Sequence, residues 1–259
     1  MAGAPQQGSG SGDTAGEGSC SSVPVALVTG GVRGLGLAVA RALAARGDAV
    51  HIVYRSSAEA AASLAEEFPG RIHRADMTRE SDVDELVSDV LARDGRIDHG
   101  IHCVGPFAAG SLLEMDAAVF RGLFEHNTTS AFLFARAVAP HLRAAAGSLL
   151  FFGCAGLAAL RGRREAAAYA AAKSALLVLV RSLALEEAPH GVRVNMLSPG
   201  IIPHADADEA TLDEERQARI PLGRAGTPED VAGAAAFLAS AAAAHITGID
   251  LEVAGGWQL

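Results

Sequence analysis

The chain has 259 residues, of which 50% are hydrophobic and only 5% aromatic, and its formal net charge is -9. The length allows a substantial core in one large domain or two small ones, and the acidic balance argues against a nucleic-acid surface. With no secretory leader, no uncharged apolar run of about 20 residues and no metal or disulfide spacing among its 3 cysteines, the chain is expected to be soluble, metal-free and cytoplasmic, without a membrane partner.

The N-terminal segment, residues 1–22, consists mostly of Gly, Ser, Ala and Gln, which predicts a flexible tail. We see no composition break or internal repeat after it, so residues 23–259 are expected to form a single domain. The apolar run 23–29 predicts a buried parallel strand, and a helix is expected at 37–46. The turn between them contains Gly30, Gly31, Gly34 and Gly36. A strand, a glycine turn and a helix in this order favour pyrophosphate binding, although a tight turn without a ligand is the alternative.

The second strand is predicted at residues 49–54 and is followed by Arg55 and Ser56. In a dinucleotide-binding fold this strand ends beside the adenosine ribose, where an acid binds the 2′-hydroxyl and an arginine a 2′-phosphate. Tyr54 occupies the place expected for the acid, and Arg33 in the glycine turn can approach the same phosphate as Arg55. Either arginine could be solvated, but together they favour NADP(H) over NAD(H).

The rest of the chain alternates between apolar runs and amphipathic segments. Further strands are expected at 71–75, 100–104, 148–153 and 192–197, and helices at 58–68, 81–94 with Ser81 as a plausible N-cap, 120–143 and 165–187. This alternation is typical of an α/β protein, and it predicts a single-domain, Rossmann-type, doubly wound parallel sheet with helices on both faces.

Tyr169 and Lys173 are one helical turn apart, so their side chains share a face of the predicted helix 165–187. A cation beside a phenol favours the phenolate and lowers the phenol pKa, which is about 10 when unperturbed. Tyr169 would then donate or accept a proton nearer neutral pH. Such a pair alone is usually a helix-surface pair, and the glycine turn far upstream makes it a candidate catalytic centre.

Together these motifs resemble the short-chain dehydrogenase/reductase family over nearly all of the chain after the tail. Residues 220–249 are especially similar to 3-oxoacyl-carrier-protein reductases. The resemblance implies that Tyr169 protonates a carbonyl oxygen as hydride arrives from NADPH, and that Lys173 tunes the tyrosine and binds the ribose. It also implies that Asn127 holds a water in the proton relay. A homotetramer is expected, formed through the helix 165–187 and the final strand 249–253.

The resemblance also implies a set of cofactor-binding residues in the glycine turn, after the second and third strands, and around the nicotinamide. They are Gly30, Arg33, Gly34, Leu35, Gly36, Arg55, Ser56, Asp76, Met77, Gly105, Tyr169, Lys173, Pro199, Gly200 and Ile202.

Three positions depart from the family pattern. Cys154 stands where the family has a catalytic serine, so it is either a weak hydrogen-bond donor to the carbonyl or a small apolar filler, and a nucleophilic role would need a base and a lowered pKa. His102 replaces an asparagine and is predicted to be a buried, hydrogen-bonded substitute rather than a catalyst. His204 replaces a threonine that meets the nicotinamide, and it either contacts cofactor or substrate or is an exposed loop residue.

The leading hypothesis is therefore an NADPH-dependent ketoreductase acting on a small-molecule or carrier-bound carbonyl compound. One alternative keeps the cofactor and reduces a C=N bond, as pteridine-type reductases do. The other is a non-catalytic NADP-binding protein of the same fold. Arg161, Arg163 and Arg164 either meet an anionic substrate or form a solvated charge run.

Overall fold

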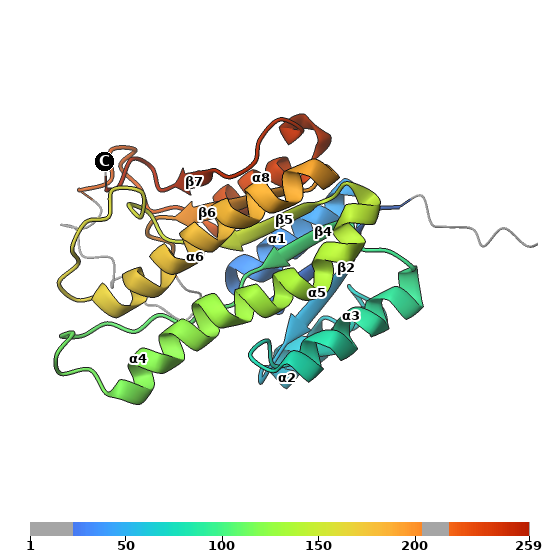
Figure 1. Cartoon of the computed structure of the whole chain (residues 1–259), viewed down its shortest axis with the longest axis horizontal. Coiled ribbons are helices and arrows are strands. Elements are labelled where there is room, and N and C mark those ends of the chain that lie inside the picture. The colour runs from blue at the N-terminus through green and yellow to red at the C-terminus, as the bar shows by residue number, and fades with distance from the viewer. Residues whose placement is uncertain (1–22, 204–217, 259) are drawn as a thin grey trace, which may run out of the picture.

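The computed structural model describes residues 23–203 and 218–258 (Figure 1), so the predicted tail and His204 lie outside the described residues. The strands are β1 (Val25–Thr29), β2 (Ala49–Tyr54), β3 (Ile72–Arg74), β4 (His99–His102), β5 (Ser148–Phe152), β6 (Arg193–Pro199) and β7 (Asp250–Val253). The longer helices are α1 (Gly34–Arg46), α2 (Ala58–Ser63), α3 (Glu80–Asp94), α4 (Ala117–Phe124), α5 (Ser130–Ala145), α6 (Ala167–Glu187) and α8 (Pro228–Ala239). Three short helical segments are η1 (Glu125–Thr129), η2 (Ala188–His190) and η4 (Ala241–Ala243).

The described strands form one 7-stranded sheet in the order β3-β2-β1-β4-β5-β6-β7, and every neighbouring pair is parallel. The predicted doubly wound sheet is therefore confirmed. The strand order reverses between β1 and β4, and ligands of open α/β sheets bind outside the carboxyl ends of the strands at such a point. Here those ends are Thr29 and His102, which are register partners.

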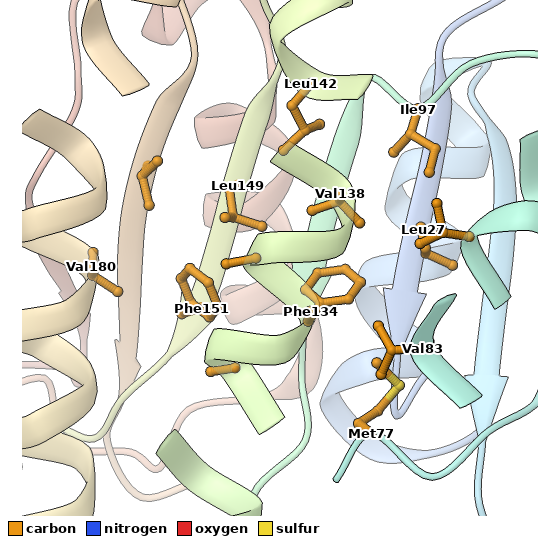
Figure 2. Close-up of a cluster of buried hydrophobic side chains, with 14 of the residues drawn as sticks. Leu27, Met77, Val83, Ile97, Phe134, Val138, Leu142, Leu149, Phe151 and Val180 are labelled. Carbon is orange, nitrogen blue, oxygen red and sulfur yellow. The ribbon is translucent and has the colours of Figure 1, made fainter. Parts of the chain in front are cut away.

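Helices cover both faces of the sheet, with α3, α5 and α6 on one face and α1 and α8 on the other (Figure 1). Figure 2 shows the first layer, in which Phe134, Val138 and Leu142 of α5 lie over the strands. All positions of β1 and β5 are buried. A sheet covered on both faces needs such continuous apolar strands, and this is why the sequence pattern predicts it well.

The predicted continuous helix over residues 120–143 is wrong, because the π-helix η1 separates α4 from α5. Three side chains there donate hydrogen bonds to the carbonyl four residues earlier: His126 to Gly122, Asn127 to Leu123 and Ser130 to His126. These donors compete with backbone N–H groups for the helix carbonyls. The amide of Ser130 bonds instead to the Glu125 carbonyl, as a π-turn requires.

Two further expectations differ locally from the structure. The helix predicted at 58–68 stops at Ser63, because the following amides of Ala65 and Glu67 make tighter bonds to carbonyls three residues back. Ser81 is not an N-cap, since α3 begins at Glu80 and its N-cap is Arg79.

Among the described residues, the segment Ala167–His190 is the one helix long and apolar enough by length and composition to cross a membrane. Its apolar window is 44% buried inside the protein. The helix contributes Leu176, Leu177 and Val180 to the core layer of Figure 2, which is the behaviour of a core helix.

The sheet contains four histidines, which are neutral at pH 7 because burial lowers the pKa of each: His51, His73, His99 and His102. His51 of β2 bonds through Nε2 to the Asp94 carboxylate at 2.7 Å, and His99 of β4 bonds through Nδ1 to the Ser148 hydroxyl at 2.9 Å. Burial lowers the pKa of both His51 and His99 to about 4, and it lowers the pKa of His102 to about 3. These imidazoles therefore stay neutral in the folded protein until the pH falls well below the pKa of an ordinary histidine.

Candidate active site

The helix α6 presents Tyr169 and Lys173 on one face, as their spacing predicts. The Lys173 ammonium lies 5.8 Å from the centroid of the Tyr169 ring and donates to the Phe152 carbonyl at 2.6 Å, at the carboxyl end of β5. Only 3% of Lys173 is exposed. Burial lowers the pKa of its ammonium to about 8, so the group is still mostly charged at neutral pH.

The expectation that Lys173 lowers the pKa of Tyr169 is not met in this structure. Burial raises the pKa of Tyr169 above its usual value and outweighs the opposing charge of Arg163. Phe107 contributes to this covering through an edge-to-face contact with the Tyr169 ring, at a centroid distance of 5.1 Å. Tyr169 is therefore a protonated phenol, the form that can donate a proton.

Asn127 lies in η1 and is fully buried. Its amide nitrogen donates to the carbonyls of Leu123 at 2.9 Å and Pro106 at 3.1 Å, while its Oδ1 has no hydrogen-bond partner in the part of the chain that the structure describes. A side chain at Gly105 would overlap this oxygen and lie 2.9 Å from the Lys173 ammonium, so both atoms border the same space. The buried Asn127 Oδ1 is thus an acceptor without a partner, close to the Lys173 ammonium. The proton relay predicted for Asn127 needs such an arrangement.

The glycine turn has the shape of a phosphate cradle. Gly30 and Gly34 have left-handed backbones, with φ of 67° and 55°, and a side chain at Gly36 would overlap the Gly30 carbonyl oxygen. The turn is thus compact, and it delivers the chain into the N-terminus of α1, where backbone amides and the helix dipole favour an anion. Arg33 is the exposed N-cap residue of this helix, and Leu35 is half-buried behind it.

Arg55 and Asp76 come together beyond the ends of β2 and β3. The Arg55 guanidinium lies 3.8 Å from the Asp76 carboxylate and 2.7 Å from His126 Nε2. Burial acts to raise the pKa of Asp76, but hydrogen bonds from Thr78 and the charge of Arg55 outweigh it and leave the pKa below its usual value. The two chain neighbours differ, because Ser56 is exposed while Met77 is buried in the core.

The predicted nicotinamide turn follows β6 at the same edge of the sheet. Pro199 is the last residue of β6, and a side chain at Gly200 would approach the Ala254 backbone to 2.7 Å. Ile202 packs against the core layer formed by α1 and α8. The residues predicted to bind cofactor thus line the carboxyl edge from β3 to β6, and they fit a dinucleotide: a glycine cradle, an arginine at one end and an orphaned amide beside an ammonium at the other.

Cys154 follows β5 and is half-buried, with a free thiol. Burial raises the pKa of this thiol, so it is not a thiolate. The thiol is at most a weak hydrogen-bond donor, which agrees with the expected lack of nucleophilic character.

His102 is buried and hydrogen-bonded, as predicted. Because the Ser130 hydroxyl donates to a carbonyl, it accepts from His102 Nε2 at 3.1 Å, and His102 Nδ1 accepts from the Thr29 hydroxyl at 3.0 Å. The imidazole therefore braces the carboxyl ends of β1 and β4 against α5.

Thr128 has no sequence signal of its own, whereas Arg163 and Arg164 belong to the arginine run noted in the sequence. Thr128 donates to the Ala172 carbonyl at 2.9 Å and thereby joins η1 to α6 next to Lys173. Arg163 donates to the Ala155 carbonyl at 2.5 Å, and its charge acts on both Cys154 and Tyr169. A cavity of about 520 Å³ lies between the loop after β4 and the loop before α6. Its lining residues are Ala109, Gly110, Ser111, Leu112, Arg164 and Glu165.

Comparisons with known proteins agree with this arrangement. Residues 30–258 match a family model described as enoyl-(acyl carrier protein) reductase. L-fucose dehydrogenase of Mus musculus is 36% identical over 252 residues, which cover 91% of this chain and 88% of that protein. The 3-oxoacyl-acyl-carrier-protein reductase of Escherichia coli is 33% identical over 242 residues, which cover 91% of this chain and 97% of the relative.

Two solved structures extend the comparison to three dimensions. A blue fluorescent protein from a metagenomic library, in complex with NADPH, has a TM-score of 0.83 and 31% identity, covering 91% of this chain and 98% of its own. A short-chain dehydrogenase/reductase from Serratia marcescens has a TM-score of 0.84 and 29% identity, with the same coverage of both chains.

Proposed function

We propose that this chain, which belongs to the short-chain dehydrogenase/reductase family, reduces a ketone to an alcohol with NADPH. Membership makes it an oxidoreductase, and the ketone and the phosphorylated cofactor are our inference. The observation that carries the proposal is the grouping of Asn127 and Lys173 around Gly105, with the Tyr169 ring beside the Lys173 ammonium.

NADPH, when bound, supplies the hydride that adds to the carbonyl carbon. This addition places negative charge on the carbonyl oxygen, and the protonated phenol of Tyr169 donates its proton there, so that a neutral alcohol results. Lys173 keeps a positive charge beside the phenol, where it stabilises the tyrosinate left behind and holds the ribose. Asn127 holds a water with its Oδ1, and this water is part of the relay that returns a proton toward Lys173 and Tyr169.

The substrate is proposed to enter beside Phe107, whose ring covers Tyr169 and is itself 63% exposed. The amide of Gly110 donates to the Glu165 carbonyl at 2.7 Å, so the two loops that flank the entrance are tied together. Their mixed lining, which includes Leu112 and Arg164, suits a substrate with both apolar and polar parts.

A panel of carbonyl and imine compounds tests the reaction type. We expect the protein to oxidise NADPH in the presence of ketones and not in the presence of cyclic imines. Turnover of imines alone would favour the pteridine-type alternative. NADPH binding without turnover of any compound would favour a non-catalytic protein.

A second candidate function is the oxidation of a sugar hydroxyl, and the similarity to L-fucose dehydrogenase favours it. The same residues serve this direction, since Tyr169 would then accept the proton of the hydroxyl. Its raised pKa works against that role near neutral pH. Assays with L-fucose and oxidised cofactor, run beside the ketone panel, separate the two directions.

The cofactor preference gives a quantitative prediction. Because Arg55 follows β2 and Tyr54 stands where an acid would select NADH, we expect NADPH to bind at least about tenfold more tightly than NADH, about 1.4 kcal/mol. Arg55→Asp should reverse much of this difference, because a carboxylate repels the 2′-phosphate. Fluorescence titration of both cofactors measures it, with the exposed Arg121→Asp on α4 as control. Equal affinities in the unmodified protein would refute the preference.

Assembly as a homotetramer remains part of the proposal. Val178 and Leu185 are two turns apart on α6 and are 65% and 81% exposed, and Phe132 of α5 is 45% exposed. Apolar side chains this open favour burial against a second copy. The strand β7, at the end of the sheet, has an unpaired edge that can extend a second contact.

We expect light scattering at micromolar concentration to give a tetramer, with a dimer as the fallback. Leu185→Lys should shift the population toward smaller species, because it places a charge in the proposed contact. Ala44→Lys on the exposed side of α1 is the control. A monomer in the unmodified protein would contradict the proposal.

A further inference from the structure

We propose that His126 is a positioning residue for cofactor selection: its imidazole holds the Arg55 guanidinium in place for the 2′-phosphate of the cofactor. This inference rests on the proposed NADPH preference and assigns part of it to a residue outside the motifs that bind cofactor. The two side chains are 71 residues apart in the sequence and meet at the adenosine end of the site.

The hydrogen bonds of His126 define which of its nitrogens faces the arginine. Nδ1 lies 2.9 Å from the Gly122 carbonyl, and a carbonyl only accepts, so Nδ1 carries the proton. Nε2 is then a lone-pair acceptor, and Arg55 Nη1 lies 2.7 Å from it. An arginine always donates, so the contact is a charge-assisted hydrogen bond from Arg55 to a neutral imidazole.

This contact competes with an ion pair. The same Nη1 atom of Arg55 is 3.8 Å from the Asp76 carboxylate, longer than a hydrogen bond. His126 thus keeps the guanidinium from closing fully on Asp76. Among residues 23–203 and 218–258, the Nε and Nη2 groups of Arg55 have no hydrogen-bond partner. Arginine uses such donors for two-point recognition of a phosphate, and His126 leaves them available.

The imidazole is itself held firmly. His126 belongs to η1, and its backbone carbonyl accepts the Ser130 hydroxyl at 2.7 Å. Its neighbour in the same π-turn is the fully buried Asn127. A side chain anchored at its ring and at its backbone can hold a partner that is otherwise an exposed, mobile arginine.

Titration of the free protein with NADPH and with NADH tests the inference without relying on turnover. We expect His126→Ala to weaken NADPH binding about tenfold and to change NADH binding less than about twofold. His126→Gln should restore most of the NADPH affinity, because its amide oxygen can accept from Arg55. In the Arg55→Ala background, His126→Ala should add little, since the residue that it positions is already gone.

Exposed His190→Ala on η2 is the matched control, and thermal unfolding of each variant checks that it is folded. Equal losses of NADPH and NADH affinity in His126→Ala, without recovery in His126→Gln, would show a general structural role and overturn the inference. Additive effects of Arg55→Ala and His126→Ala on NADPH would also overturn it. Equal binding of NADPH and NADH by the unmodified protein would overturn the proposed cofactor preference itself. That failure is seen in the unmodified protein, whereas a failure of the role of His126 alone is seen only in the variants.

Discussion

Replacement of Tyr169 by phenylalanine is expected to lower ketone turnover by about 10²–10⁴-fold while NADPH still binds. The change removes the phenol proton and leaves the ring that packs edge-to-face with Phe107. Because the buried phenol is protonated in the structure, its role in reduction is that of the acid, and phenylalanine cannot replace it. Single-turnover kinetics with saturating NADPH measures the loss, and a cofactor titration measures binding.

Two neighbours provide the controls for this experiment. Lys173→Ala should damage turnover and NADPH binding together, because the ammonium serves both the phenol and the ribose. Cys154→Ala should cost little, and Cys154→Ser should hold or raise activity, since a hydroxyl is a better donor than a thiol of raised pKa. If Cys154→Ala abolished turnover while Tyr169→Phe left it intact, the thiol would carry the chemistry and the relay described above would be wrong.

Acid is expected to destabilise this protein well before its carboxylates titrate. The pKa of His51 and of His99 is about 4 in the folded protein, against 6.5 for an ordinary histidine. Below pH 6.5 the unfolded chain therefore binds more protons than the folded one, so the free energy of unfolding falls as pH falls toward 4. Each of these shifts corresponds to roughly 3 kcal/mol, present in full above pH 6.5 and lost near pH 4.

Denaturant unfolding at about pH 7.5, 6 and 5, at one protein concentration, measures this loss. His102→Asn removes one titrating imidazole and keeps hydrogen-bonding groups near Thr29 and Ser130, so the dependence of stability on pH should become shallower. The exposed His190→Asn should leave it unchanged. A stability that stays flat from pH 7.5 to 5 would show that the buried histidines accept protons without cost.

Much of the fold follows from local patterns. The strand predicted at residues 49–54 coincides with β2, because a buried parallel strand needs an apolar run and little else. The glycine turn is equally readable, since the left-handed backbones at Gly30 and Gly34 restrict those positions to very few residue types.

Other features depend on contacts that no local pattern contains. The helix over 120–143 reads as continuous, yet it is interrupted by η1, because the side chains of His126, Asn127 and Ser130 take up carbonyls of their own helix. Whether such donors turn inward depends on what surrounds them. The contact of Arg55 with His126 has the same origin, since the parallel strands and η1 bring together segments far apart in the chain.

The doubly wound sheet, the glycine turn and the shared helical face of Tyr169 and Lys173 could all be predicted from the sequence, because each depends on residue type and on a spacing set by helix or strand geometry. The direction of the Tyr169 pKa shift, in contrast, follows from the tertiary structure. From the sequence, the charge of Lys173 argues for a lowered pKa; in the fold, burial under Phe107 and beside Cys154 is the larger effect and raises it. Charge can be read from a residue's identity, whereas desolvation depends on what the rest of the chain packs around it.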